Sequence, residues 1–261
     1  MPRFDVLTIF PRMIEAGTSE GIVARAVSKG LVTIGISDLR EFTHDRHRSV
    51  DDAPFGGGPG MVMKAEPFFD AVEALPEVEG APRAIVLLSP RGKPFDQRTA
   101  ERYATLDHLI LLCGRYEGVD ERVASDLATE ELSLGDFVLT GGETPALAVI
   151  EATVRLLPGA LGDEESAAAD SFSDGVLDHA HFTRPAVFRG QKVPEALLSG
   201  DHERIRLFRR KEALRTTLQR RPGLFKSAHL THEDRALLRE IEIEEERTAE
   251  FSKVGMNDES D

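Results

Sequence analysis

This sequence of 261 residues is short of cysteine, and Cys113 is the only one. A single cysteine cannot form an internal disulfide, so we expect the reducing environment of the cytoplasm. Long apolar runs are missing too, because none reaches the ~20 residues that cross a bilayer. The N-terminus has no secretory hydrophobic segment. We therefore expect a cytoplasmic protein without a membrane partner.

Two nucleotide-binding signatures are also absent. The chain has neither the Gly-Lys-Ser/Thr of a phosphate-cradling loop nor the Gly-x-Gly-x-x-Gly of dinucleotide-binding folds. These absences disfavour a nucleotide-dependent oxidoreductase on a Rossmann sheet. An excess of positive charge is missing as well, since the net charge is −14. That value argues against binding of nucleic acid through overall charge.

The charge is unevenly distributed along the chain. Residues 183–226 contain 12 Lys and Arg against 4 Asp and Glu, whereas residues 227–261 contain 4 against 11. Because distant charges are screened beyond about 8–10 Å, a local basic segment bears on phosphate binding more than the total does. The pattern alone leaves two interpretations open, a solvated helix face or a contact surface for nucleic acid.

The first 160 residues alternate between strand-like and helix-like patterns. The apolar runs at 84–89 and 108–113 are continuous, which is typical of strands buried on both faces of a parallel sheet. The alternation predicts an α/β fold with a parallel sheet. Strands are predicted at 4–10, 31–36, 84–89 and 108–113, and helices at 13–29 with a break near 17–21, at 65–75 and at 97–105.

The composition changes near residue 162. Residues 163–178 carry six acidic residues and no basic ones, and only helical patterns follow, with Leu207, Leu214 and Leu218 on one face. Thr231 or its neighbour is expected to cap the last helix. We predict an α/β domain at 1–162, a linker at 163–182, a small all-α domain at 183–250 and a frayed tail at 251–261.

The stretch 132–146 is the most informative segment. Its apolar run 137–139 is predicted as a short strand, and Thr144 and Pro145 are predicted as the N-cap and first residue of a helix that continues to Leu157. Small residues between them, Gly141 and Gly142, let backbone groups approach a ligand closely, although an ordinary strand–helix turn has the same pattern.

Two further loops, 88–92 and 113–118, follow the predicted strands 84–89 and 108–113. In open parallel sheets, ligands bind beyond the carboxyl ends of the strands. We therefore expect these loops and the stretch 132–146 to form one pocket.

Four motifs carry a resemblance to a known family. They are Cys-Gly-Arg-Tyr-Glu-Gly-Val-Asp-Glu-Arg from Cys113, the stretch 132–146, Phe-Thr-His-Asp-Arg-His-Arg from Phe42, and Pro-Phe-Gly-Gly-Gly-Pro-Gly-Met from Pro54. Over about residues 4–225 the chain resembles the bacterial tRNA (guanine-N1)-methyltransferases, of the SPOUT class of knotted methyltransferases. The resemblance implies a deep trefoil knot in the α/β domain and a homodimer whose active sites are shared between subunits.

The resemblance also implies S-adenosyl-L-methionine as cofactor, held largely by backbone groups of the three loops. Magnesium is implied as well, with Glu117 as the one residue assigned to it. The expected cofactor-binding residues are Leu88, Ser89, Pro90, Gly114, Tyr116, Glu117, Gly118, Ser133, Leu134, Gly135, Asp136, Phe137, Val138, Leu139, Gly141, Gly142 and Pro145.

The implied reaction is methyl transfer to N1 of guanosine 37 in tRNA, beside the anticodon. N1 is a poor nucleophile until its proton leaves, so a general base and a group that stabilises the developing charge are needed. By resemblance, Asp170 is the base and Arg155 stabilises the guanine. Without the resemblance, the sequence alone favours Asp170 as a solvated charge of an acidic linker and Arg155 as a surface residue of a helix.

Contacts with tRNA are implied for two regions. His47 lies in His44-x-x-His47, which resembles a metal site by spacing, but the family interpretation favours RNA contact. Asp201 stands where the family usually has Asn, which puts one contact in doubt because a carboxylate cannot donate a hydrogen bond. The expected tRNA-binding residues are His47, Asp51, Gly60, Ser199, His202 and Arg209.

A second hypothesis from another class is a catalytically silent RNA-binding module that keeps the fold only as a scaffold. The presence of both Arg155 and Asp170 argues against it. Binding of S-adenosyl-L-methionine separates the two hypotheses, because a silent module need not bind it.

Overall fold

The computed structural model describes residues 1–76, 82–162 and 170–257. The chain divides into two compact units, Met1–Glu164 and Glu165–Asp261, and each has its own hydrophobic core. Within the described ranges, no helix is long and apolar enough to cross a membrane.

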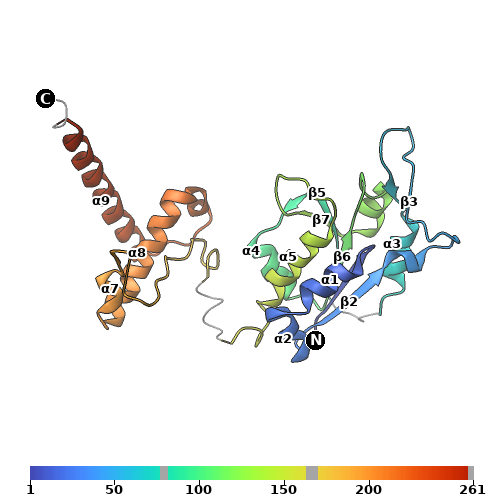
Figure 1. The fold of residues 1–261 in the computed structure, drawn as a ribbon, viewed down its shortest axis with the longest axis horizontal. Coiled ribbons are helices and arrows are strands. Elements are labelled where there is room, and N and C mark those ends of the chain that lie inside the picture. The colour runs from blue at the N-terminus through green and yellow to red at the C-terminus, as the bar shows by residue number, and fades with distance from the viewer. Residues whose placement is uncertain (77–81, 163–169, 258–261) are drawn as a thin grey trace. The chain divides into compact units, whose positions relative to one another are not determined.

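The first unit alternates strands and helices (Figure 1). In chain order its elements are β1 (Arg3–Thr8), α1 (Pro11–Thr18), α2 (Gly21–Ser28), β2 (Thr33–Asp38), the 3-10 helix η1 (Leu39–Phe42), β3 (Asp51–Asp52), β4 (Val62–Met63), α3 (Glu66–Glu73), β5 (Arg83–Pro94), α4 (Gln97–Ala104), β6 (His108–Cys113), the π-helix η2 (Val123–Leu127), β7 (Glu130–Ser133) and α5 (Glu143–Val154).

Five strands form a parallel sheet in the order β2-β1-β6-β5-β7. The predicted α/β fold with a central parallel sheet is thus confirmed. Side chains alternate between the two faces of each strand. Those of β6, for example, enter two separate cores: Leu109 and Leu111 pack with α1, α2, α4 and α5, whereas Ile110 and Leu112 pack with α3, η1 and η2.

Strand β5 is irregular where it passes β7. Leu88 and Lys93 both pair with Leu132, so residues 89–92 leave the ladder between them. After this excursion Pro94 pairs with Ser133, and the amide of Phe95 donates to the Ser133 carbonyl at 2.8 Å. The excursion carries the end of β5 outward and gives the first unit one of its loops at the carboxyl side of the sheet.

Two predictions for the stretch 132–146 are wrong. Residues 137–139 are a loop, and the strand is β7, Glu130–Ser133. The apolar run has no neighbouring strand, and Val138 is 86% exposed. Helix α5 begins at Glu143 with Gly142 as N-cap, two residues before Pro145, because the Glu143 side chain is anchored inside the protein.

The second unit contains helices and a small hairpin. Its elements are β8 (Val187–Phe188), β9 (Gln191–Lys192), α7 (Glu195–Leu198), α8 (His202–Arg220), the 3-10 helix η3 (Pro222–Lys226) and α9 (His232–Asn257). The expectation of helices alone misses the antiparallel pair β8–β9, whose strands of two residues are too short for a periodic pattern. Helix α9 also includes residues 251–257, which the sequence places in a tail.

The core of the second unit lies between α8 and α9. Leu214, Leu237 and Ile241 are buried there together with Val176. At the start of α9 the Thr231 hydroxyl accepts from the Asp234 amide at 3.1 Å, and the Asp234 carboxylate accepts from the Thr231 amide at 2.9 Å. This reciprocal pair is a capping box and confirms Thr231 as the cap.

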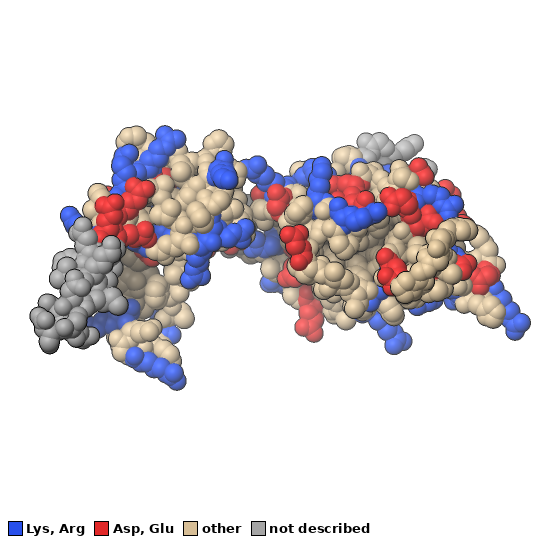
Figure 2. Space-filling model, turned by 90° about the horizontal axis from the view of Figure 1, so that it is seen from above, with Lys and Arg blue, Asp and Glu red and all other residues tan. Residues whose placement is uncertain are grey.

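Charges on α8 and α9 pair across the helix–helix contact. Arg206, Arg210, Lys211 and Arg215 of α8 form ion pairs with α9 carboxylates, those of Glu233, Asp234, Glu240 and Glu244. Four of the twelve bases of residues 183–226 are thus paired with the acidic segment that follows. Basic side chains (blue) and acidic side chains (red) both remain visible on the surface of this unit (Figure 2).

A buried charge cluster joins the central strands of the sheet. The Asp5 carboxylate on β1 is 2.8 Å from His108 Nε2 on β6 and accepts from Arg3 at 2.6 Å. Burial alone would raise the pKa of Asp5, but the hydrogen bonds from His108 and Arg3 outweigh it and hold the pKa below its ordinary 3.8. Because the folded pKa is lowered, this contribution to stability is present above pH ~4 and is lost as the pH falls through the folded pKa.

Replacing Asp5 by Asn should therefore destabilise the sheet in a pH-dependent way. We expect the free energy of unfolding at pH 7 to fall by about 2–4 kcal/mol, because Arg3 and His108 lose a buried ionic partner. The difference from wild type should shrink below pH ~4. Urea unfolding followed by circular dichroism at both pH values measures it, with Asp120→Asn, which breaks the exposed Asp120–Arg122 pair, as control. A pH-independent difference would refute the assignment.

Candidate functional site

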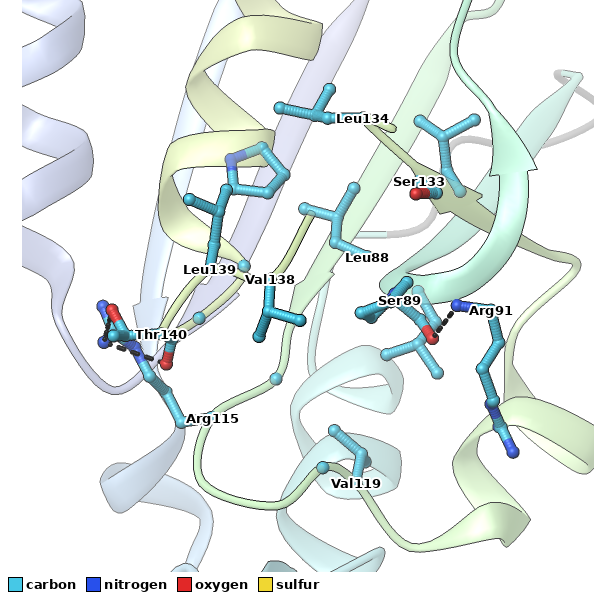
Figure 3. A pocket seen from close by; sticks show the side chains of 18 of the residues that line it. Leu88, Ser89, Arg91, Arg115, Val119, Ser133, Leu134, Val138, Leu139 and Thr140 are labelled. Atoms are coloured by element: carbon cyan, nitrogen blue, oxygen red, sulfur yellow. Dashed lines mark hydrogen bonds between the residues drawn. The ribbon is translucent and has the colours of Figure 1, made fainter. Parts of the chain in front are cut away.

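A cavity of about 460 Å³ lies at the carboxyl ends of β5, β6 and β7, beside the first turn of α5 (Figure 3). This volume is typical of small-molecule sites. Its lining residues come from the excursion of β5, from the loops that follow β6 and β7, and from the adjoining parts of the strands. In Figure 3 the side chains of Leu88, Val138 and Leu139 face the same space, with Arg115 and Thr140 to one side and Ser89 and Arg91 to the other.

The first loop is the excursion of β5. The Ser89 hydroxyl accepts from the Arg91 amide at 3.2 Å, which turns the backbone over the cavity. The Arg91 guanidinium lies 2.9 Å from Glu121 and 3.5 Å from Glu131. The one basic side chain of this loop is thus already paired with carboxylates.

The second loop, 114–119, turns through two residues with positive φ, Tyr116 at 60° and Gly118 at 141°. Its backbone is fixed by the short strand β4, since the Met63 amide donates to the Gly118 carbonyl at 2.9 Å. The Glu117 amide donates to the Met61 carbonyl at 3.0 Å. The Tyr116 and Glu117 side chains remain exposed at the edge of the cavity.

The third loop, 134–142, ends against the second. The Gly142 amide donates to the Gly114 carbonyl at 2.9 Å, and a Cβ at Gly142 would lie only 2.7 Å from Cys113 Cα. Only glycine permits this approach. Burial, and to a smaller extent the negative charge of Glu143, raises the pKa of the Cys113 thiol well above 9.0. Cys113 is therefore unreactive as a nucleophile.

The Glu143 carboxylate holds the second and third loops to the sheet. It is completely buried, accepts from Arg115 Nε at 2.8 Å and accepts from the Thr8 hydroxyl on β1 at 2.6 Å. Arg115 also donates to the Thr140 carbonyl and hydroxyl at 3.2 and 3.1 Å. One buried acid at the start of α5 therefore connects β1 with both loops.

The charges around the cavity indicate what kind of ligand it takes. Arg91 and Arg115 are neutralised by acidic partners, so neither offers a bare cation to a phosphate group. The mouth carries exposed apolar side chains, those of Tyr116, Phe137, Val138 and Leu139. A ligand without phosphate groups, which combines apolar surface with groups that hydrogen-bond to the backbone, fits this lining.

The cavity brings together all the residues expected to bind the cofactor except Asp136, which is exposed and does not line it. Sequence reasoning missed some lining residues. All but Leu87 lie inside the loops and motifs already singled out, but their positions in those segments did not mark them as lining residues. The residues missed are Leu87, Arg91, Arg115, Val119, Glu121, Leu132 and Thr140.

Arg155 and Asp170 do not line the cavity of their own chain. Arg155 is the C-cap of α5, so at 1.5 Å per residue it lies ~15 Å along the helix from Pro145 at the cavity. Asp170 belongs to the second unit. The segment after Asp170 turns back on itself, because the Asp178 amide donates to the Ser171 hydroxyl at 2.9 Å. The Asp178 carboxylate lies 2.8 Å from His181 Nε2.

Two of the expected tRNA-binding residues of the first unit, His47 and Gly60, are exposed. His47 is exposed and its amide donates to Asp45 at 2.7 Å. The metal interpretation of His44-x-x-His47 is not supported, because His44 Nε2 lies 2.8 Å from Asp70 instead. Gly60 packs against Glu117, whose Cγ would lie 2.3 Å from a Cβ at that position. Asp51 lies in β3 and is partly buried.

The expected tRNA-binding residues of the second unit lie around the start of α8. Ser199 precedes the helix and its hydroxyl accepts from the Asp201 amide at 3.2 Å. Asp201 is the N-cap and accepts from the amides of Glu203 and Arg204, each at 3.1 Å. This capping needs only an acceptor, which Asp supplies as well as Asn. His202 and Arg209 are exposed.

The parallel sheet and the backbone-lined cavity at its carboxyl edge define an α/β protein with a small-molecule site. The chain belongs to the tRNA (guanine-1)-methyltransferase family. The profile of that family, described as tRNA (Guanine-1)-methyltransferase TrmD, matches residues 2–227.

Relatives from several bacteria are similar over nearly their whole length. A tRNA (guanine-N(1)-)-methyltransferase of Dehalococcoides mccartyi is 52% identical over 243 residues, covering 93% of this chain and 98% of the relative. Proteins of the same name from Dictyoglomus turgidum and Moorella thermoacetica are each 52% identical, covering 94% of this chain and 98% and 99% of the relatives.

Replacing Glu143 by Gln should destabilise the first unit and weaken ligand binding in the cavity. The change leaves the largely buried Arg115 without its ionic partner, and breaking such a pair costs about 3–5 kcal/mol. Glu130→Gln, which removes the partner of the half-exposed Arg102, should cost less than about 1 kcal/mol. Thermal unfolding of both variants tests this, and equal effects would show that the Glu143 contacts are not what holds the loops.

Proposed function

We propose that the protein transfers the methyl group of S-adenosyl-L-methionine to N1 of guanosine 37 in tRNA, and so supports reading-frame maintenance. The carrying observation is the cavity, which is lined by the loops whose motifs identify the family and lies in a chain that matches the family along residues 2–227. The relatives named above are tRNA (guanine-N(1)-)-methyltransferases, and methyltransferases of this kind use S-adenosyl-L-methionine.

The cavity fits this cofactor in size and in chemistry. A sulfonium with an adenosine group needs apolar contacts, which Leu88, Val138 and Leu139 offer, and backbone hydrogen bonds, for which the three loops line the cavity. The bound cofactor supplies an electrophilic methyl group. Because Arg91 and Arg115 are already paired, no unpaired lining arginine repels the positive sulfonium.

The reacting nitrogen must lose its proton as the methyl carbon bonds to it. We propose that the Asp170 carboxylate takes the N1 proton, while the Arg155 guanidinium stabilises the negative charge that develops toward O6 of the guanine. The methyl group would come from the sulfur of the bound cofactor, which would leave as S-adenosylhomocysteine. The proton stays on Asp170 until product release.

Magnesium is the third component that we propose, with Glu117 as its protein ligand. Carboxylate oxygens are the donors that Mg²⁺ prefers, and Mg²⁺ commonly uses one or two of them together with substrate groups and water. The Glu117 side chain lies at the edge of the cavity beside Gly60, where its oxygens are accessible. When bound there, the ion would supply positive charge close to the reacting groups.

We further propose a homodimer with shared active sites. Arg155 lies ~15 Å along α5 from the cavity of its own chain, so a second chain has to supply it if both act on one guanine. An exposed apolar surface for such a contact exists around Arg115, where Phe10 and Met13 are exposed and Arg115 contacts both. Exposed apolar surface of this kind marks protein interfaces.

We also propose a trefoil knot in the first unit and separate roles for the two units. Support for the knot comes from the excursion 89–92 and from loop 134–142, which passes against residues 113–118 before α5 begins. We propose that residues 163–182 act as a linker, of which 163–169 lie outside the described residues, and that the helical domain 183–250 binds tRNA in the cytoplasm. Residues 251–261 take no part in this proposal.

An assay with labelled S-adenosyl-L-methionine and unmodified tRNA tests the reaction. Wild type with Mg²⁺ should label guanosine 37, and replacement of that guanosine by adenosine should abolish labelling. Asp170→Asn should bind the cofactor normally in calorimetry but lose about 100-fold or more in kcat. Cofactor binding without transfer by wild type would indicate a silent RNA-binding module instead.

A heterodimer tests the sharing of sites. Leu139→Trp fills the cavity from an exposed loop and Arg155→Gln removes the guanidinium, so each homodimer should be inactive. A heterodimer purified by two tags has one intact cavity facing one intact Arg155, and should regain about half of wild-type activity by symmetry. A heterodimer as inactive as its parents would place both groups of a site in one chain.

A further inference from the structure

The segment 181–190 of the second unit is exposed at every residue, and so are Gln191 and Lys192 after it. We call residues 181–192 the hairpin arm. It contains the pair β8–β9, in which Val187 lies opposite Lys192 and Phe188 opposite Gln191. A two-stranded hairpin is marginally stable by itself, so this arm gains little from the core between α8 and α9.

The arm exposes three large apolar side chains. Phe188 is 61% exposed, and Phe182 and Val187 are about half exposed. Burying a phenylalanine side chain is worth roughly 1.5–3 kcal/mol, and the fold leaves that gain unused. Exposed apolar groups rimmed by polar ones mark interaction sites.

The arm is also positively charged and has no acidic residue. Its bases are Arg184, Arg189 and Lys192, and among the described residues none of them has an ion-pair partner. The bases of α8 differ, since Arg206 and Lys211 are each paired with two carboxylates. The bases of the arm are thus more available to an anionic partner than the paired bases of the α8–α9 contact.

The turn of the arm sets an arginine beside an aromatic ring. Arg189 and Gly190 have φ of 49° and 81°, as in the two-residue turns with positive φ that match the twist of a hairpin. This turn places the Arg189 guanidinium 5.3 Å from the centroid of the Phe188 ring. A flat apolar face and a planar cation therefore project together from the tip.

We propose that the hairpin arm binds the unpaired nucleotides of the anticodon loop, with a base stacked on Phe188 and phosphates held by Arg189, Lys192 and Arg184. This inference rests on the proposed function, which brings a tRNA anticodon arm to the protein. Single-stranded RNA is recognised through bases stacked on aromatic rings and arginine planes. Duplex RNA hides its bases within the stack and would use the charges without the ring.

Two substitutions of Phe188 separate stacking from simple apolar contact. Phe188→Leu keeps an apolar side chain but removes the ring, and should weaken the Kd for an anticodon stem-loop about 5- to 100-fold. Phe188→Tyr keeps the ring and should bind as wild type. The measurement uses the full chain with a stem-loop containing guanosine 37 and, in parallel, a perfect duplex of the same length, for which Phe188→Leu should have no effect.

The charges have a matched control. Arg189→Gln, at an unpaired base, should weaken stem-loop binding several-fold, whereas Lys211→Gln, at a base paired with Glu240 and Glu244, should leave the Kd unchanged. Cofactor binding in calorimetry should be normal in every variant, which shows that the first unit is folded.

The outcomes distinguish this inference from the proposed function. If wild type methylates guanosine 37 but Phe188→Leu binds the stem-loop as tightly as wild type, the inference fails and the function stands. Equal loss for Phe188→Leu on stem-loop and duplex would also overturn stacking. If wild type transfers no methyl group to guanosine 37, the proposed function fails, whatever the hairpin arm binds.

Discussion

The buried carboxylate of Glu143 is the contact on which the site depends. It lies at the first residue of α5 and binds both Thr8 on β1 and Arg115 in the loop after β6. A carboxylate is costly to bury without hydrogen-bond partners. The position of Glu143 therefore fixes the positions of Thr8 and Arg115, which donate to it. Three chain segments far apart in sequence are thereby held at one place, and the backbone-lined cavity exists because they cannot separate.

The same pairing decides the chemistry of the cavity. Arg115 and Arg91 both lie in its lining, yet their charges are used within the protein by Glu143 and by Glu121 and Glu131. What remains for a ligand is backbone and apolar surface. A cationic methyl donor is compatible with such a lining, while a nucleotide phosphate would find no unpaired cation there.

Much of the fold follows from periodicity, and the exceptions have physical causes. The continuous apolar runs of β5 and β6 predict buried parallel strands because only such strands are apolar on both faces. The run 137–139 has the same composition but lies at the mouth of the cavity, where apolar residues serve a ligand rather than a core. The predicted start of α5 is wrong because the sequence does not distinguish a glutamate whose carboxylate is buried, such as Glu143, from one on the surface.

For the site, the motifs predicted nearly every lining residue, but not the contacts that neutralise the arginines. Those contacts join residues such as Arg91 and Glu131, which are 40 positions apart. Charge counts were misleading in a similar way, because the basic segment 183–226 and the acidic segment after it fold against each other as α8 and α9. A count along the chain cannot tell charges that face each other from charges that face solvent.

The pairing of α8 with α9 has a consequence for the role of salt. Lys and Arg side chains that are paired with carboxylates of α9 are neutralised by the protein itself. They therefore release no mobile ions when RNA binds. Only bases without such partners contribute to the slope of log K against log salt, at ~0.7–0.9 per phosphate neutralised. The affinity of this chain for RNA should therefore be less sensitive to ionic strength than the arginine content of α8 suggests, because Arg206, Arg210 and Arg215 are already paired.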